Sequence, residues 1–237
     1  MQIYYIKYKT IYKLLIIVVL VLLILSIALT YKNKAINTFK NDDVYYKGNI
    51  DKEVIAFTCN VDWGNEYIKP MLKIFKENSI KITFFVTGRW AEKNEKLIKL
   101  IYNEGHEIGN HGYLHRDYSK LSYELNKKEI LKTQQIVKDI LGVKTKYFAP
   151  PAGAYSDKTV RAAKDLNHEV IMWSIDTIDW RKDSTKDKII NRVISKAHNS
   201  AIVLMHPKKE TVKALPIIIN KLKEKGYKVG RVSDIIK

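Results

Sequence analysis

The chain has 237 residues, of which 46% are hydrophobic, so it can bury the core of an ordinary domain without covalent cross-links. A single cysteine, Cys59, excludes an internal disulfide and any cysteine-based zinc knuckle. The net charge of +17 favours a polyanionic neighbour such as lipid headgroups or a cell wall, and a lysine-rich composition without a specific partner is the alternative. No nucleic-acid-binding motif is recognisable, so we expect no nucleic-acid partner.

The N-terminal segment carries a long apolar run. Residues 14–31 contain no charged side chain and are mostly branched aliphatic, which is enough to cross a bilayer. Lysines precede the run, so the positive-inside tendency places the rest of the chain on the extracytoplasmic side. We therefore expect residues 1–31 to form a cytoplasmic N-terminus and a single transmembrane helix in the cell membrane. Secretion after signal cleavage is the alternative, because Ser26 and Ala28 fit a small-residue cleavage pattern.

Beyond this run, a polar linker is followed by an alternation of β-type and helical patterns. Residues 32–50 are polar and aperiodic, and we expect the folded domain to occupy residues 51–237. The predicted strands lie at 54–62, 80–88, 106–111, 146–150, 169–176, 201–206 and 227–232. The predicted helices lie at 66–78, 92–104, 122–141, after Ser156, at 186–198 and at 211–225. This alternation predicts an α/β fold with parallel strands, either a barrel or a doubly wound sheet.

Reactive side chains follow the carboxyl ends of these predicted strands, where parallel folds place their functional residues. The segments concerned are "NVDWG", "NHGYLH", "APPAG", "DTIDW" and "MHP". Because parallel strands end at the same edge, we expect these segments to meet on one rim of the sheet. Arg89, at the end of the second strand, lies on the same rim and either adds positive charge there, caps a helix or forms an ion pair on the surface.

Histidines in one of these segments suggest a metal site. His111 and His115 are four positions apart, and either a helical face or a turn lets both imidazoles reach one cation. Asp62 ends another strand and offers a carboxylate. A site of two histidines and one aspartate leaves a coordination position open for water, which is the catalytic arrangement. We expect a divalent metal, with zinc as the first choice and cobalt or another transition metal as alternatives.

A further histidine, His206, ends a predicted buried strand. It is either a core histidine with a satisfied hydrogen bond or a proton donor whose basicity is set by a nearby carboxylate. Asp179 is available for that role from the neighbouring strand end. Asp176, in the same segment, is an additional candidate whose role the pattern leaves open.

Together these motifs resemble those of the NodB-type polysaccharide deacetylases, carbohydrate esterase family four, over nearly all of residues 51–237. "HGYLH" matches the family's His-x-x-x-His motif, "APPAG" its Arg-Pro-Pro-Tyr-Gly loop, "DTIDW" its Asp-x-x-Asp-Trp motif and "LMH" its Leu-x-His motif. The resemblance is strongest to the membrane-anchored, sporulation-associated members, which share "NVDWG" and "MWSIDTIDW". It implies a distorted (β/α) barrel of about seven parallel strands.

The resemblance also implies a reaction, the hydrolysis of N-acetyl groups on an aminosugar polymer such as peptidoglycan or a related cell-wall glycan. A divalent metal polarises the acetyl carbonyl and activates water. The backbone N–H of Ala152, just after the paired prolines, stabilises the oxyanion. His206 protonates the leaving amine and is held by Asp179, while Trp180 and Leu204 form the wall around the acetyl methyl group.

Two departures from the family pattern affect this expectation. Asn60 stands where the family has its catalytic base, and an amide accepts no proton near neutral pH. Ala149 stands where the family has the arginine that pairs with that base, so both halves of the ion pair are replaced together. Asp62 is left either as the metal ligand or as the base. A deacetylase is therefore the leading expectation, and a glycan-binding or scaffolding pseudoenzyme that keeps the barrel and the metal is the alternative.

Overall fold

The computed structural model describes residues 13, 15–23, 26 and 43–237. The chain divides into two compact units, Met1–Asn41 and Asp42–Lys237. In the first unit, residues 15–23 are helical. Among the described positions, no helix combines the length and apolar character that crossing a membrane requires. The predicted span 14–31 lies in part outside the described residues.

In the second unit the strands form one sheet. The strands are β1 (Val44–Tyr45), β2 (Val54–Val61), β3 (Thr83–Val86), β4 (Glu107–Asn110), β5 (Tyr147–Phe148), β6 (Glu169–Ile171), β7 (Ile175–Asp176), β8 (Ile202–Met205) and β9 (Lys228–Gly230). Their order is β1-β6-β5-β4-β3-β2-β8-β7, and β9 also pairs with β2. The ladders between these strands are parallel, which confirms the predicted α/β architecture.

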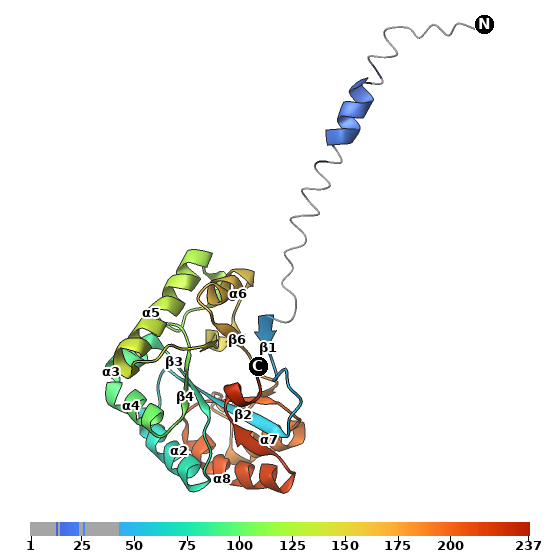
Figure 1. Ribbon diagram of the computed structural model, residues 1–237. Coiled ribbons are helices and arrows are strands. Elements are labelled where there is room, and N and C mark those ends of the chain that lie inside the picture. Colours follow the sequence, from blue (N-terminus) through green and yellow to red (C-terminus); the bar gives the residue numbers. More distant parts are fainter. Residues whose placement is uncertain (1–12, 14, 24–25, 27–42) are drawn as a thin grey trace, which may run out of the picture. The chain divides into compact units, whose positions relative to one another are not determined.

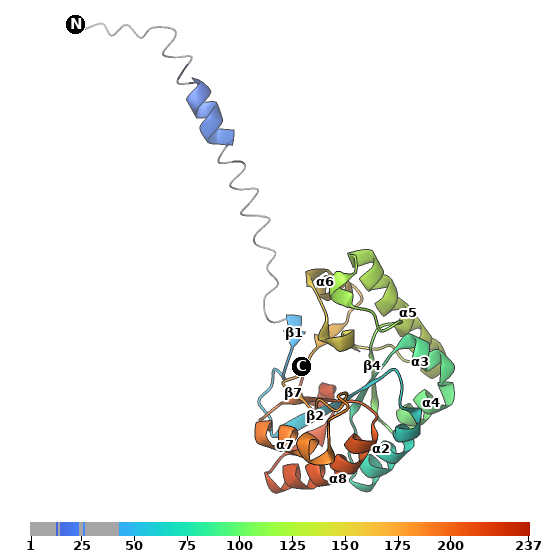
Figure 2. The same ribbon diagram turned by 180° about the vertical axis from the view of Figure 1, so that it is seen from behind.

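The helices surround the strands, as Figures 1 and 2 show from opposite sides. They are α2 (Asn65–Glu77), α3 (Gly88–Lys93), α4 (Glu95–Asn103), α5 (Tyr123–Leu141), α6 (Asp157–Lys164), α7 (Lys186–Lys196) and α8 (Lys209–Glu224). Short 3-10 helices are η2 (Tyr118–Lys120), η3 (Pro151–Gly153) and η4 (Val232–Asp234). The predicted helix at 92–104 is confirmed as α4, which begins later than expected, and α3 is an additional short helix before it. Asn94 separates the two helices, and its side-chain amide donates to the carbonyl oxygen of Trp90.

The sheet curves into an incomplete barrel. β6 is the second strand from one end of the sheet and β7 is the last strand at the other end, although only residues 172–174 connect them. A connection this short spans roughly 14 Å at most, so the two ends of the sheet must approach each other. The N–H of Met172 donates to Tyr45 of β1, and the N–H of Ser174 donates to Ile202 of β8.

The strand count therefore differs from the predicted seven. The predicted strand at 169–176 is two strands, because its halves pair with different ends of the sheet. β1 adds a strand inside the predicted linker 32–50, since Val44 pairs with Val170 of β6. The folded unit thus begins before residue 51. Gly48 is needed in this segment, because a Cβ there would lie 2.4 Å from the carbonyl oxygen of Ile235.

Side chains of β2 point alternately to the two faces of the sheet, one toward the core beneath the helices and the other toward the site. Phe57, Cys59 and Val61 are fully buried in the cluster beneath the helices. Ala56 belongs to the smaller cluster inside the barrel. Because successive side chains in a strand point to opposite faces, Asn60 faces the barrel interior near the strand's carboxyl end. Cys59 therefore packs in the core and lies away from the site.

Candidate active site

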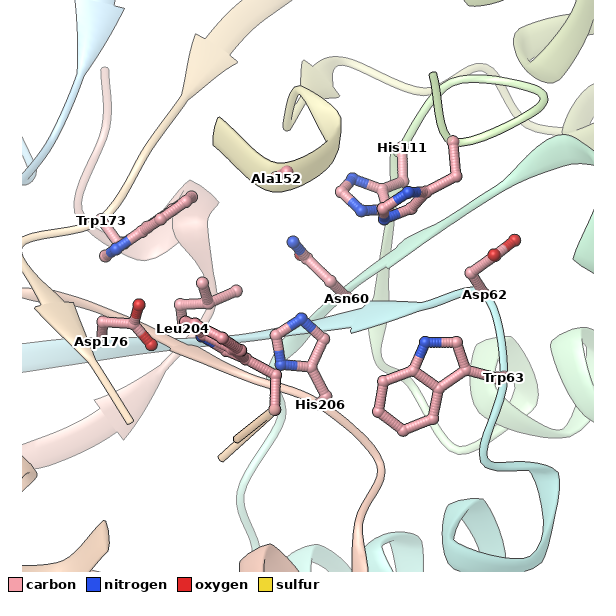
Figure 3. Close-up of a pocket in the computed structure, with 11 residues that line it drawn as sticks. Asn60, Asp62, Trp63, His111, Ala152, Trp173, Asp176, Leu204 and His206 are labelled. Carbon is pink, nitrogen blue, oxygen red and sulfur yellow. The ribbon is translucent and has the colours of Figure 1, made fainter. Parts of the chain in front are cut away.

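A cavity of about 430 Å³ opens at the carboxyl ends of the strands, and its lining comes from segments far apart in the sequence. Figure 3 shows the side chains around it. The lining residues are Asn60, Asp62, Trp63, His111, His115, Ala152, Trp173, Asp176, Trp180, Leu204 and His206. The structure therefore brings together most of the residues that the sequence singled out. Arg89 lies beside this cavity in an adjoining hollow that shares Asp62 and Trp63.

His206 and Asp179 form a hydrogen-bonded dyad on one side of the cavity, in which Asp179 is buried and His206 is partly exposed. Nδ1 of His206 contacts Oδ1 of Asp179 at 2.7 Å, and the backbone N–H of His206 donates to Oδ2 at 2.8 Å. Thr211, in the first turn of α8, donates its hydroxyl to the same Oδ2 at 2.6 Å. Because Nδ1 is engaged by a carboxylate, Nε2 of His206 is the nitrogen left for a ligand in the cavity.

Aromatic side chains that the sequence did not identify as site residues complete this side. The ring of Trp63 stacks on His206 with centroids 5.7 Å apart and planes 10° from parallel. Trp173 lies over Gly153, where a Cβ would come within 2.7 Å of the indole. Both tryptophans stand inside quoted motifs, "NVDWG" and "MWSID", and their position beside reactive residues was the available signal.

His111 and His115 face each other on the opposite side. Nδ1 of His111 donates to the carbonyl oxygen of Ala149 at 2.7 Å, which leaves Nε2 as the free nitrogen. The two rings are 5.1 Å apart between centroids and nearly perpendicular. Burial, with a smaller contribution from His115, lowers the pKa of His111 to about 3. Burial also lowers the pKa of His115, so both imidazoles are neutral at pH 7.

Asp62 is engaged by the N-cap residue of α3 and by a residue in the first turn of that helix. Thr87 donates its hydroxyl to Oδ1 at 2.6 Å, and Nε of Arg89 donates to the same oxygen at 2.7 Å. A terminal nitrogen of Arg89 donates to Oδ2, so the guanidinium holds the carboxylate with two bonds. Burial by itself raises the pKa of Asp62, but the hydrogen bonds from Arg89 and Thr87 outweigh it and hold the pKa below its usual value.

This pairing bears directly on the expected metal site. In Figure 3 the carboxylate of Asp62 points away from His111. No cluster of three or more His, Cys, Asp or Glu side chains suited to an ion occurs within the part of the chain that the structure describes. A cation joining Asp62 would also meet the adjacent positive charge of Arg89. The two histidines offer free nitrogens, but the complete donor set expected for zinc or cobalt is not assembled, so the residues do not fit that site.

Asn60 stands at the base of the cavity, where the family pattern has a carboxylate. The residue is 6% exposed, and its side-chain oxygen has no hydrogen-bond partner among the described residues. Ala149 is buried against the barrel interior and fills the other substituted position. An unpaired buried amide oxygen costs about 1–3 kcal/mol, so it is unusual in a folded protein.

The remaining predicted residues line the cavity with different environments. Leu204 is buried, whereas the indole of Trp180 is 53% exposed at the mouth. Ala152 has a φ of 54°, a left-handed conformation that side-chain-bearing residues rarely adopt. Asp176 accepts the backbone N–H of Ile178 at 2.6 Å, so one carboxylate oxygen is already committed. Local strain at Ala152 is consistent with a functional loop.

Comparison with known proteins gives concordant matches. The family described as "Polysaccharide deacetylase" matches residues 47–171. The chain is 42% identical to the "Uncharacterized protein YlxY" of Bacillus subtilis (strain 168), over 81% of this chain and 60% of that protein. It is 33% identical to a "Peptidoglycan-N-acetylglucosamine deacetylase" of Bacillus cereus, over 76% of this chain and 67% of that protein.

Solved structures add a relevant neighbour. BA3943 of Bacillus anthracis, described as a "CE4 family pseudoenzyme", is 41% identical with a TM-score of 0.79, over 81% of this chain and 68% of that one. A mutant of BA3943 is described as having "restored enzymatic activity"; it is 39% identical with a TM-score of 0.79, over 81% of this chain and 70% of that one.

Proposed function

Because the chain belongs to the polysaccharide deacetylase family, carbohydrate esterase family four, we propose that it binds N-acetylated aminosugars of a cell-wall glycan in this cavity without hydrolysing them. The observation that carries the proposal is the pairing of Asp62 with Arg89. Asp62 is the acidic side chain expected to serve as either metal ligand or base, and both of its carboxylate oxygens are already engaged by Arg89 and Thr87, so neither is free to hold an ion or a water molecule.

The position of the catalytic base supports the same conclusion. Removing a proton from water near pH 7 needs a group with a suitable pKa within hydrogen-bonding reach. The amide of Asn60 accepts no proton near pH 7. The pKa of Asp62 is lowered, so its carboxylate is a weaker base than an ordinary one. Neither side chain therefore supplies the nucleophile that hydrolysis of an amide requires.

Binding of a sugar polymer is supported by the cavity's aromatic rim. Trp63 and Trp180 are 42% and 53% exposed, and large exposed aromatic faces beside a cavity are suited to packing against sugar rings. Leu204 supplies an apolar wall at the base. The net charge of +17 adds attraction to a polyanionic cell wall. Peptidoglycan is the glycan that we favour, because relatives carry its name.

An extracytoplasmic location at the cell membrane completes the proposal. It is supported by the uncharged run 14–31 and by the lysines before it. The described aliphatic side chains from Leu15 to Leu23 are each about half exposed, from 49% to 60%. A helix that is apolar on every side suits a lipid environment.

Metal-dependent deacetylation is the second candidate function, with zinc first and cobalt as the alternative ion. It is favoured by the intact dyad of His206 and Asp179, which is arranged as a proton donor to a leaving amine requires. This candidate requires Asp62 to leave Arg89.

The two candidates are separated by measuring binding and turnover on the same sample. Full-length protein is mixed with N-acetylglucosamine oligomers and with peptidoglycan fragments, with added zinc or cobalt. We expect calorimetric binding without release of acetate. Acetate released by the unmodified protein and lost in His206→Ala would contradict the proposal and support the deacetylase.

A further inference from the structure

A second hollow lies beside the candidate active site, and its lining is strongly basic. Its volume is about 450 Å³, and Trp63, which stacks on His206, belongs to the lining of both. Its basic walls come from the segments that follow β7 and β8 and lead into α7 and α8. The basic side chains that line it are Arg181, Lys182, Lys208 and Lys209. Neither deacetylation nor the binding of a neutral sugar explains this concentration of positive charge.

Acidic side chains balance only part of that charge. Glu210 is engaged through both carboxylate oxygens, by Nζ of Lys213 at 2.7 Å and by the backbone N–H of Lys186 at 3.1 Å. Asp179 is completely buried and already serves as the acceptor in the dyad. Glu66 is therefore the carboxylate in the lining that remains to face the basic side chains.

The lysines of this hollow have no acidic partners of their own. Lys182, Lys208 and Lys209 form no ion pair within the part of the chain that the structure describes. Lys208 donates Nζ to the carbonyl oxygen of Trp180 at 3.0 Å, and the same Nζ lies 5.2 Å from the centroid of the Trp63 ring. Because like charges around one hollow repel one another, their arrangement favours an anion that neutralises them.

The free cations fit a phosphate better than a carboxylate. A planar carboxylate is matched best by the two parallel N–H groups of a guanidinium. The guanidinium of Arg181 is already engaged by Asp183, with Nε donating to Oδ1 at 2.9 Å and a terminal nitrogen donating to Oδ2 at 3.4 Å. The ammonium groups of lysines act as point charges and can surround the several oxygens of a phosphate.

We propose that this hollow binds a phosphodiester polymer of the cell wall, beside the sugar held in the adjoining cavity. A polymer chain can enter a hollow, whereas the headgroups of a flat membrane reach only its edge. The sequence carries no nucleic-acid-binding motif, which disfavours a nucleic acid as the phosphodiester. This inference rests on the extracytoplasmic location in the proposed function and adds a second class of ligand to it.

The variants compare this hollow with the opposite end of α8. The hollow variant removes three charges and combines Lys182→Gln, Lys208→Gln and Lys209→Gln. The control variant removes the same charge from exposed positions around the carboxyl end of α8 and combines Lys221→Gln, Lys223→Gln and Lys225→Gln. A double variant, Lys182→Gln with Lys209→Gln, leaves the contacts of Lys208 with the two tryptophans in place. Circular dichroism establishes that each variant is folded.

The experiment is calorimetric titration of the full-length protein with poly(glycerol phosphate), repeated at increasing salt concentration. We expect the hollow variant to bind at least about tenfold more weakly than the unmodified protein, and the control variant to bind within about twofold of it. The double variant should lie between them. Added salt should weaken binding by the unmodified protein more than binding by the hollow variant, because fewer charges are then left to screen.

The outcomes are distinguishable. Equal losses in the hollow and control variants would show a general attraction by net charge and overturn the inference. Binding of polyglutamate, of an oligothymidylate or of phosphatidylglycerol vesicles as tight as that of poly(glycerol phosphate) would overturn the assignment to a wall phosphodiester.

A parallel titration with the tetramer of N-acetylglucosamine separates this inference from the proposed function. Failure of poly(glycerol phosphate) to bind while the tetramer binds overturns the inference and leaves the proposed sugar binding standing. The reverse result overturns the proposed sugar binding and leaves the basic hollow as a phosphodiester site.

Discussion

The two sides of the cavity are built from the same type of strand end but differ in how their carboxylates are used. On the β7–β8 side, Asp179 is completely buried and holds His206 toward the cavity. On the β2–β4 side, Asp62 turns to Arg89 instead of joining His111. The comparison indicates that the side expected to donate a proton has the paired histidine and aspartate that the family pattern implies, whereas the side expected to activate water is built around an internal ion pair.

The largest predicted difference between the sides is in stability. Asp179→Ala removes a buried acceptor that serves His206 and Thr211, and we expect a loss of about 3 kcal/mol in the free energy of unfolding. Asp62→Ala should cost under about 1 kcal/mol, because the freed guanidinium of Arg89 is 43% exposed and can be hydrated. Urea denaturation of both variants measures the difference.

Asp183→Ala is the control for that comparison, since Asp183 pairs with Arg181 and Lys188 on the surface. Its denaturation midpoint should stay close to that of the unmodified protein. If Asp179→Ala shifted the midpoint no further than Asp183→Ala does, the pairing of Asp179 with His206 and Thr211 would contribute no more to stability than a surface ion pair does.

Acidification should have the next largest effect, and besides His111 and His115 it acts on histidines outside both sides of the cavity. Burial lowers the pKa of His168 to about 4, below the ordinary value of 6.5. The unfolded state therefore binds more protons between these values, so this contribution to stability is fully present above pH 6.5 and is lost as the pH falls toward 4. We expect a loss of about 2 kcal/mol from this residue over that range.

Thermal denaturation at pH 7 and pH 5 checks the acid effect. His168→Gln should show a smaller decrease in Tm between the two values, because the titrating group is absent. Burial likewise lowers the pKa of His106, to about 4, so part of the dependence should persist in this variant. An equal decrease in both proteins would show that His168 does not contribute.

The smallest predicted effect tests whether Arg89 keeps the β2–β4 side from binding a metal. Arg89→Met removes the positive charge and frees both oxygens of Asp62. We expect zinc and cobalt to bind at least about tenfold more tightly than to the unmodified protein, a change of about 1.4 kcal/mol. Equilibrium dialysis with elemental analysis measures the affinity without any assay of activity.

Adding His111→Ala to Arg89→Met provides the control, since it removes one of the free imidazole nitrogens. The gain in affinity should then disappear. Equal metal affinity of Arg89→Met and the unmodified protein would refute the role that we assign to the guanidinium.

Local signals predicted much of the fold. The predicted helix at 122–141 is confirmed as α5, which Ser122 caps and Gly142 ends in a left-handed conformation. The division of residues 169–176 into β6 and β7 could not be predicted in this way. Both halves look like one apolar strand, and only their pairing with opposite ends of the curved sheet separates them. β1 escaped prediction because a two-residue strand has too few positions to show a periodicity.

By itself, the sequence determined which reactive residues meet on one rim, because the carboxyl ends of parallel strands share an edge. It also showed that an amide, Asn60, stands where the family pattern has a carboxylate. Only the tertiary structure decided the partner of Asp62. Arg89 and the two histidines are all near that strand end, and a carboxylate pairs with the group whose position and hydrogen-bond geometry fit best. That choice depends on side-chain directions in three dimensions, which spacing along the chain does not encode.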